Sequence, residues 1–218
     1  MLSEALLVRA FSLLNRTPNG VPWTSKSPKG HAMTGSTALS EEQFLRHAGG
    51  QDGWNFFLSL NPSSQTKTKP SKADISHLCC FGVDMDPFPG RSTTVDIQGT
   101  ARALDSAISS LTGQQNNHTI IFSGRGLWAW VFTEVLPLSS PSEQEKADRW
   151  IKAFTQALLA HSPELSSLGL IDTSCAELSR IARCPGTINY KNGQMATIVI
   201  DYTPMQFVSS QRLIDISS

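Results

Sequence analysis

The sequence contains few cysteines, and none of them forms the C-x-x-C pair that is typical of zinc-binding modules. Cys79 and Cys80 are adjacent in an apolar run, while Cys175 and Cys184 lie far from them. This pattern argues against a zinc knuckle and against a framework of disulfides. We expect the cysteines to be free, buried thiols in a reducing compartment.

An excess of charge is also missing, since 18 basic and 18 acidic residues give a net charge of zero. Proteins that bind nucleic acid are often strongly basic, so this balance counts mildly against that class. It does not exclude an enzyme that gathers acidic metal ligands in one cleft and surrounds them with basic residues, because these charges cancel.

No stretch approaches the ~20 apolar residues that are needed to cross a bilayer. The N-terminal segment does not read as a signal peptide, because Glu4 and Arg9 interrupt its apolar residues. We therefore expect a soluble, cytoplasmic protein that does not engage a membrane. A Walker A segment is absent as well, so a helicase motor would have to lie outside this chain.

The length of 218 residues suits one large domain, and the 39% of hydrophobic residues suffice for a folded core. No linker interrupts the middle of the chain. We expect a helical and loop segment at residues 1–50, packed on a main domain at residues 51–218, with one globular unit overall.

Hydrophobic periodicity and capping signals predict helices at residues 2–14, from Ser40, at 100–111 and from Ser140. Runs of β-favouring residues predict strands at 54–60, 77–84, 118–124, 127–133, 195–201 and 206–208. Residues 17–38 are rich in Pro, Gly, Ser and Thr, which indicates a loop or mobile arm, and residues 177–184 are expected to form a helical turn.

Strands and helices do not alternate strictly along the chain, as they would in a doubly wound fold. We therefore predict an α+β (mixed α/β) fold, in which helices flank a central mixed or antiparallel sheet.

The first candidate site is Asp84-Met85-Asp86, at the end of a predicted strand. Side chains alternate along a strand, so both carboxylates should point to the same side. A divalent cation such as Mg²⁺ or Mn²⁺ would offset their mutual repulsion. Alternatively, the strand simply ends at a polar turn, since Pro87 follows at once.

The second candidate is the segment Ser123-Gly124-Arg125-Gly126, between two predicted strands. Glycines on both sides of Arg125 let the backbone approach a ligand, and the Ser123 hydroxyl and the guanidinium could contact phosphate. An ordinary hairpin turn would explain the same glycines.

The third candidate is Asp172, after an apolar run, followed by a basic segment that contains Arg180, Arg183, Asn189 and Lys191. Such a segment can present positive charge to a triphosphate or a template strand. A helix cap at Asp172 and a solvated arginine surface are the alternative explanations.

The order of these motifs resembles that of the archaeo-eukaryotic primase superfamily. The order is D-x-D after a strand, S-G-x-G between strands, a hydrophobic residue before Asp, and then R-x-P-G-T-x-N-x-K. The resemblance covers roughly residues 54–200 and is closest to the primase-polymerase domains of plasmids and phages. It implies that residues 51–218 form a catalytic domain of this type.

By this resemblance, Asp84, Asp86 and Asp172 would hold the catalytic Mg²⁺ or Mn²⁺ ions. Residues near the incoming nucleotide and its phosphates would be Ser123, Gly124, Arg125, Gly126, Arg183, Asn189 and Lys191, with Arg180 as a further candidate. Many members of the superfamily have His where this chain has Trp128. The indole carries no charge, which puts triphosphate affinity in doubt and leaves Trp128 either in the core or stacking on a base.

The implied function is that of a DNA primase or polymerase domain in a plasmid- or phage-type replication protein. It would transfer nucleotides from NTPs or dNTPs to primers on a single-stranded DNA template, with a replicative helicase as a possible partner. A lysine-rich segment could contact the template or primer backbone, or it could be solvated surface; its lysines are Lys67, Lys69 and Lys72. Two other functions stay open: a catalytically weak DNA-binding module for replication initiation, and a metal-dependent nuclease.

Overall fold

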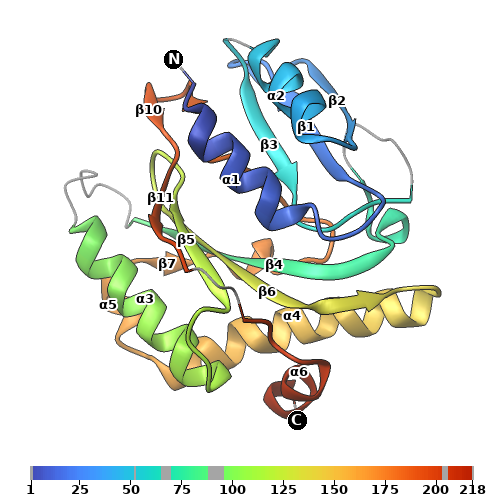
Figure 1. The fold of residues 1–218 in the computed structure, drawn as a ribbon. Helices are drawn as coiled ribbons and strands as arrows, with labels where there is room; N and C mark the ends of the chain where they lie inside the picture. The colour runs from blue at the N-terminus through green and yellow to red at the C-terminus, as the bar shows by residue number, and fades with distance from the viewer. Residues whose placement is uncertain (1, 52, 65–69, 88–95, 203–205, 218) are drawn as a thin grey trace.

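The computed structural model describes residues 2–51, 53–64, 70–87, 96–202 and 206–217. Two antiparallel sheets form the body of this part of the chain, with helices packed against them (Figure 1). The predicted α+β fold with an antiparallel sheet and flanking helices is confirmed. No helix among the described residues combines the length and the apolar character that a membrane span requires.

The upper sheet of Figure 1 has the strand order β2-β1-β3-β8, and the lower sheet has the order β11-β5-β6-β4-β7. The upper sheet consists of β1 (Val21–Lys26), β2 (Met33–Ala38), β3 (Asn55–Ser59) and β8 (Ile181–Arg183). The lower sheet consists of β4 (His77–Asp86), β5 (His118–Phe122), β6 (Leu127–Pro137), β7 (Leu170–Ile171) and β11 (Thr197–Ile200). A small separate pair is formed by β9 (Ile188–Asn189) and β10 (Gln194–Met195).

The helices of the described chain are α1 (Glu4–Leu14), α2 (Glu41–Gly49), α3 (Ile97–Thr112), α4 (Pro141–His161), α5 (Leu165–Leu168) and α6 (Ser210–Ser217), with 3₁₀ turns η1 (Lys72–Asp74) and η2 (Thr173–Cys175). Both predicted serine caps are present: Ser40 accepts a hydrogen bond from the Gln43 amide, and Ser140 forms a capping box with Glu143. These caps satisfy amide groups that the first helical turn leaves free.

Two hydrophobic cores lie on opposite faces of the lower sheet. One core fills the space between this sheet and helices α3 and α4, and the other lies between the two sheets together with α1 and α2. Strand β4 contributes to both, since Val83 and Met85 belong to the first core and Cys80 to the second. The alternation therefore directs Asp84 toward the side of the upper sheet.

The prediction of a loop or mobile arm at residues 17–38 is wrong, because this segment forms the hairpin of β1 and β2. Strand β1 also pairs with β3, and the Trp23 ring stacks on Phe56 with centroids 5.3 Å apart. Gly35 is needed where the strands approach, since a Cβ there would lie 2.5 Å from the Trp23 carbonyl oxygen. The glycine thus serves strand pairing, where the sequence pattern indicated a loop.

Two further predictions of local structure are wrong. Residues 177–184 were expected to form a helical turn, but they contain β8, which pairs with β3 and buries Ala182. Residues 206–208 were expected to form a closing strand, but they make a single bridge between Val208 and Thr133 before α6 begins. In both places contacts with distant segments decide the structure.

The four cysteines are free and buried, as predicted.

Residues on both sides of position 50 contribute to the upper sheet, since β1 and β2 precede this position and β3 and β8 follow it.

Gly82 marks a close approach within the second core, and its substitution tests the packing there. A Cβ at Gly82 would lie 2.4 Å from Trp128 Cζ3 and 3.1 Å from Leu60 Cδ1. Both neighbours are buried, so we expect Gly82→Ala to lower the free energy of unfolding by about 1–3 kcal/mol in urea denaturation. Gly49→Ala is the matched control: within the described residues, nothing lies within 4 Å of a Cβ at this position, so the substitution should be neutral or stabilising. Equal unfolding midpoints for the two variants would contradict this packing.

Candidate active site

The pairing of β7 with β4 places two segments that are distant in sequence side by side. Ile171 lies opposite Met85, and Leu170 opposite Asp86. Just beyond β7, the Asp172 amide donates a hydrogen bond to the Asp84 carbonyl oxygen at 2.9 Å. The first and third predicted motifs therefore meet at the end of β4.

The carboxylates of Asp84 and Asp172 converge on the thiol of Cys175. The sulfur lies 2.9 Å from Asp172 Oδ2 and 3.3 Å from Asp84 Oδ2. One ligand atom from each of these three residues lies within 4.8 Å of the other two. Asp86 is not a member of this group among the described residues, although its charge acts on Asp84.

Asp84 is in an environment that opposes its negative charge. Burial raises the pKa of Asp84 to about 7, and the charges of Asp86 and Asp172 add to this rise. The hydrogen bond from Cys175 and the charge of Arg180 act in the opposite direction, but they are too weak to cancel it. A bound cation would favour the ionised form of this carboxylate.

Asp172 is in the contrasting environment. Its Oδ1 accepts hydrogen bonds from the amide of Ser174 at 2.9 Å and from its hydroxyl at 2.6 Å, so it caps the turn η2. Hydrogen bonds from Cys175 and Ser174 lower the pKa of Asp172 below the ordinary value. Asp172 thus caps the turn η2 and also lies beside Asp84. The sequence had left these two roles as alternatives.

The turn from Ser123 to Gly126 joins β5 to β6 and lies against the end of β4. The Ser123 amide donates to the Gly126 carbonyl at 2.9 Å, and Gly124 has a φ of +88°, which favours glycine. A Cβ at Gly126 would lie 2.5 Å from the Met85 carbonyl oxygen. Both glycines are therefore required by the turn and by its close contact with β4.

The β9–β10 segment supports this turn from the other side. Asn189 Nδ2 donates to the Ser123 carbonyl at 3.3 Å, and the side chain of Asn192 donates to the Gly124 carbonyl. Asn189 also caps its own turn, because its Oδ1 accepts from the Lys191 amide at 3.2 Å. The second predicted motif is thus held in place by the basic segment that follows the third.

Arg180 approaches the acidic group across the face of Trp128. Its guanidinium carbon lies 5.4 Å from the Trp128 ring centroid, and its Nη2 lies 2.5 Å from Cys175 Sγ. The Trp128 side chain is only 7% exposed and belongs to the core between the sheets. Arg180 therefore places a positive charge beside the Trp128 indole. Trp128 occupies the position at which many members of the primase superfamily have histidine.

Arg183 lies on β8 in the upper sheet without a carboxylate among its contacts in the described chain. Its Nη1 donates to Asn55 Oδ1 at 2.8 Å, and its guanidinium carbon lies 4.9 Å from the Phe57 ring centroid. Burial lowers the pKa of Arg183 to about 10. The side chain of Lys191 is exposed at the β9–β10 turn.

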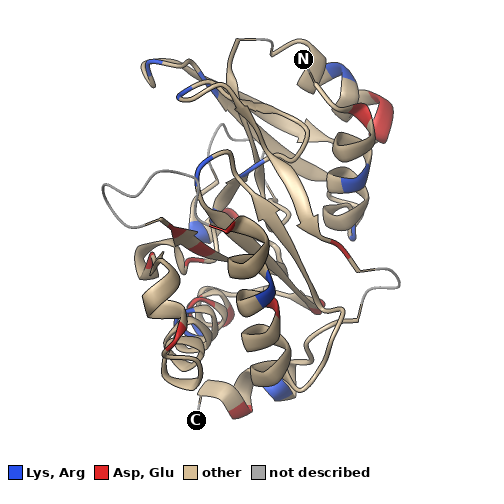
Figure 2. Ribbon diagram, turned by 90° about the vertical axis from the view of Figure 1, so that its left-hand side faces the viewer, with Lys and Arg blue, Asp and Glu red and all other residues tan. Residues whose placement is uncertain are grey.

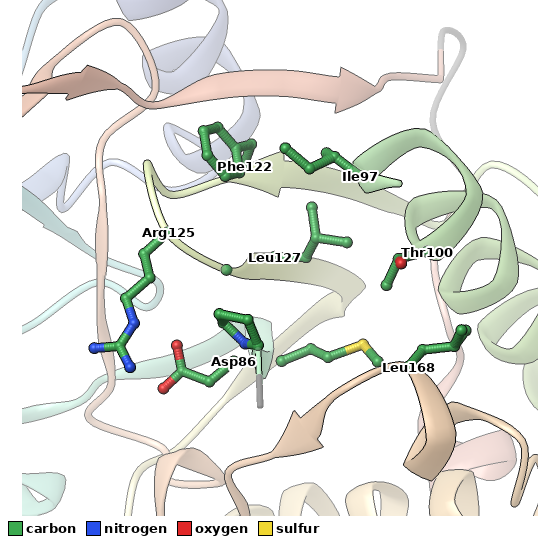
Figure 3. A pocket seen from close by; sticks show the side chains of 10 residues that line it. Asp86, Ile97, Thr100, Phe122, Arg125, Leu127 and Leu168 are labelled. Atoms are coloured by element: carbon green, nitrogen blue, oxygen red, sulfur yellow. The ribbon is translucent and has the colours of Figure 1, made fainter. Parts of the chain in front are cut away.

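Asp86 and Arg125 lie on the same side of a small pocket, and their charged ends face each other in Figure 3. The rest of the wall is largely apolar and includes Ile97, Phe122 and Leu168. Figure 2 faces the left-hand side of Figure 1 and shows acidic and basic positions close together on that side. The pocket adds an apolar surface beside the charged groups.

Of the three lysines that were predicted to contact nucleic acid, the structure describes Lys72 alone. Lys67 and Lys69 lie outside the described residues. Lys72 lies in η1, and its Nζ forms an ion pair with Glu145 of α4 at 2.5 Å. Contact with a nucleic acid would have to compete with this ion pair.

Two residues of the site were missed by the sequence analysis. Cys175 was treated as one of several free thiols, although its position three residues after Asp172 places it in the same turn. Asn55 was read as part of a strand, yet its side chain holds both Arg183 and the amide of Tyr190. No sequence signal for Asn55 existed, because its partners come from distant segments.

No family model matches the sequence, and no curated protein matches it. Among solved structures, the chain is similar to the AEP domain of the primase-polymerase of cyanophage S-2L, with a TM-score of 0.62 and 13% identity, over 100% of this chain and 99% of that one. It is also similar to primase RepB′, with a TM-score of 0.61 and 10% identity, over 98% of this chain and 62% of that one. The catalytic domain of RepB′ in complex with initiator DNA gives a TM-score of 0.59 at 11% identity, over 96% of this chain and 93% of that one. The chain therefore has the fold of archaeo-eukaryotic-type primase-polymerase catalytic domains, and the predicted likeness is confirmed at the level of fold.

The two acids of the site should affect stability in opposite directions. Because the pKa of folded Asp84 is raised, its contribution to stability is present at low pH and is lost as the pH rises through about 7. We expect Asp84→Asn to increase the free energy of unfolding at pH 8 by about 1 kcal/mol or more, with the gain vanishing near pH 4. Urea denaturation in the presence of a chelator measures this effect.

Asp172→Asn is the matched comparison. The lowered pKa of Asp172 means that its contribution is present above its ordinary pKa and is lost as the pH falls. We expect this variant to be less stable than the wild type at pH 8, by about 0.5–1 kcal/mol. Destabilisation of equal size by both substitutions at pH 8 would refute the assigned environments.

Proposed function

We propose that this chain is a primase-polymerase catalytic domain that transfers nucleotides to the 3′ end of a strand paired with a single-stranded DNA template. The observation that carries the proposal is the convergence of the Asp84 and Asp172 carboxylates beside the glycine-bounded turn. The fold shared with the S-2L and RepB′ domains supports it. A replication protein of plasmid or phage type is the proposed context.

The residues present fit a divalent cation. The site offers carboxylate oxygens from two separate segments within 4.8 Å of each other, and burial makes the charge of Asp84 unfavourable without a counter-charge. Asp84 and Asp172 would hold the ion, and Asp86 would add negative charge next to them. Mg²⁺ or Mn²⁺ bound there would supply Lewis-acid stabilisation of the reacting phosphate.

The other residues would bind and orient the nucleotide. The reaction forms a bond from the 3′ oxygen to the α-phosphorus and releases pyrophosphate, so negative charge must be held on the triphosphate. Arg125, Arg180, Arg183 and Lys191 are the proposed phosphate contacts, and Asn189 fixes the turn that carries Ser123. Their role is to position charge, since a protein base is not required for this transfer.

A second candidate function is a DNA-binding module of the same fold with weak or no catalysis. Burial of Trp128 favours it, because an uncharged side chain that is 7% exposed cannot hold a triphosphate in place of histidine. In the main proposal, the Arg180 guanidinium, which lies over this ring, supplies the missing charge. The two functions differ in whether nucleotides are incorporated.

Extension of a labelled primer on a single-stranded DNA template tests the proposal. With Mn²⁺ or Mg²⁺ and either dNTPs or NTPs, we expect the wild type to lengthen the primer, and Asp84→Asn and Asp172→Asn to lower the rate by at least about 10³-fold. Asp215→Asn on α6, whose side chain pairs with Gln211, is the control and should retain full activity.

Each alternative has its own outcome in this assay. DNA binding without incorporation under all conditions would support the non-catalytic module and reject the polymerase. Shortening of the labelled strand by metal alone, without nucleotides, would indicate a nuclease instead.

A further inference from the structure

Cys175 differs from the other cysteines in its surroundings. Its sulfur contacts two carboxylates and the Arg180 guanidinium, whereas the thiol of Cys184 contacts the carbonyl oxygen of Pro185. Cys175 ends the turn η2, which the Asp172 carboxylate caps, so its position relative to Asp172 is fixed locally. Both cysteines are buried, and burial alone does not explain the polar contacts of Cys175.

The Cys175 sulfur lies close enough to both carboxylates to bind the same cation as they do. A ligand atom from each of Asp84, Asp172 and Cys175 lies within 4.8 Å of the others, and the three atoms come from two segments of the chain. Two oxygen ligands alone suit Mg²⁺, which strongly prefers oxygen. A sulfur ligand shifts the preference of a site toward softer cations such as Zn²⁺, Cd²⁺ and, to a smaller extent, Mn²⁺.

We propose that Cys175 Sγ is a third protein ligand of the cation site and that it makes the site select Mn²⁺ and softer divalent cations over Mg²⁺. The sulfur would bind as the thiolate, and its proton would pass to solvent. The use of this selectivity in nucleotide transfer rests on the proposed function, whereas the coordination itself does not.

Cadmium binding to the full chain tests coordination without any activity measurement. Cd²⁺ bound to a thiolate gives an ultraviolet charge-transfer band, so titration of the wild type should produce such a band with a stoichiometry of about one thiolate per ion. Cys175→Ser should lose the band, and Cys184→Ala, which removes a buried thiol that contacts the Pro185 carbonyl, should keep it. Persistence of the band in Cys175→Ser, or Cd²⁺ binding by the wild type without a band, would overturn the proposal.

Selectivity is measured by calorimetric titration of the same variants with Mn²⁺ and with Mg²⁺. Because serine offers an oxygen in place of sulfur, we expect Cys175→Ser to bind Mn²⁺ about tenfold more weakly, with a much smaller change for Mg²⁺. Equal effects on both ions would reduce Cys175 to a hydrogen-bond donor that orients the carboxylates, and would reject it as a ligand. Circular dichroism confirms that each variant is folded.

The outcomes separate this proposal from the proposed function. Oxygen-only coordination together with primer extension would reject the role of Cys175 and leave the polymerase intact. A sulfur–cadmium band without any nucleotide incorporation would support the ligand and reject the polymerase. If neither Mn²⁺ nor Cd²⁺ binds the wild type, the cation site and the role of Cys175 both fail.

Discussion

The short pairing of β7 with the end of β4 is the constraint on which the site depends. Strand β7 consists of Leu170 and Ile171 only, yet its two partners on β4 are Met85 and Asp86. The next residue extends the contact through a backbone hydrogen bond to Asp84. Without this register, nothing in the local sequence would place Asp172 beside an acid that lies about two fifths of the chain earlier.

The consequence of this pairing is an accumulation of like charge in a partly buried place. Burial raises the pKa of Asp84 to about 7, whereas hydrogen bonds from Cys175 and Ser174 lower the pKa of Asp172. Such an arrangement lowers stability unless a counter-charge is present, and buried groups of this kind concentrate at functional sites. Arg180 and the thiol of Cys175 relieve part of this cost in the protein alone.

Much of this arrangement was predictable from the sequence where the signals were local. The capping residues Ser40 and Ser140 indicated two helix starts, and both caps are present. The order of short motifs indicated the fold, which the similar structures confirm at low identity. The roles proposed for the residues of these motifs in the reaction remain predictions.

The parts that were predicted wrongly or missed depend on distant contacts. Pro22 and Gly35 read as loop residues, but pairing with β3 and stacking of Trp23 on Phe56 outweigh this local preference. Residues 181–183 become a strand only because β3 is there to pair with them. Cys175 enters the site because β7 brings its turn to β4, and no pattern within the turn encodes that contact.

Asp84 and Asp172 are proposed to form one cation site for nucleotide transfer. A crystal structure with Mn²⁺ and a non-hydrolysable nucleoside triphosphate tests it most directly, through the anomalous signal of manganese. We expect a manganese peak within ligand distance of both carboxylates, with the triphosphate against the turn that carries Ser123. Well-ordered manganese and nucleotide bound elsewhere, with no ion between Asp84 and Asp172, would contradict it.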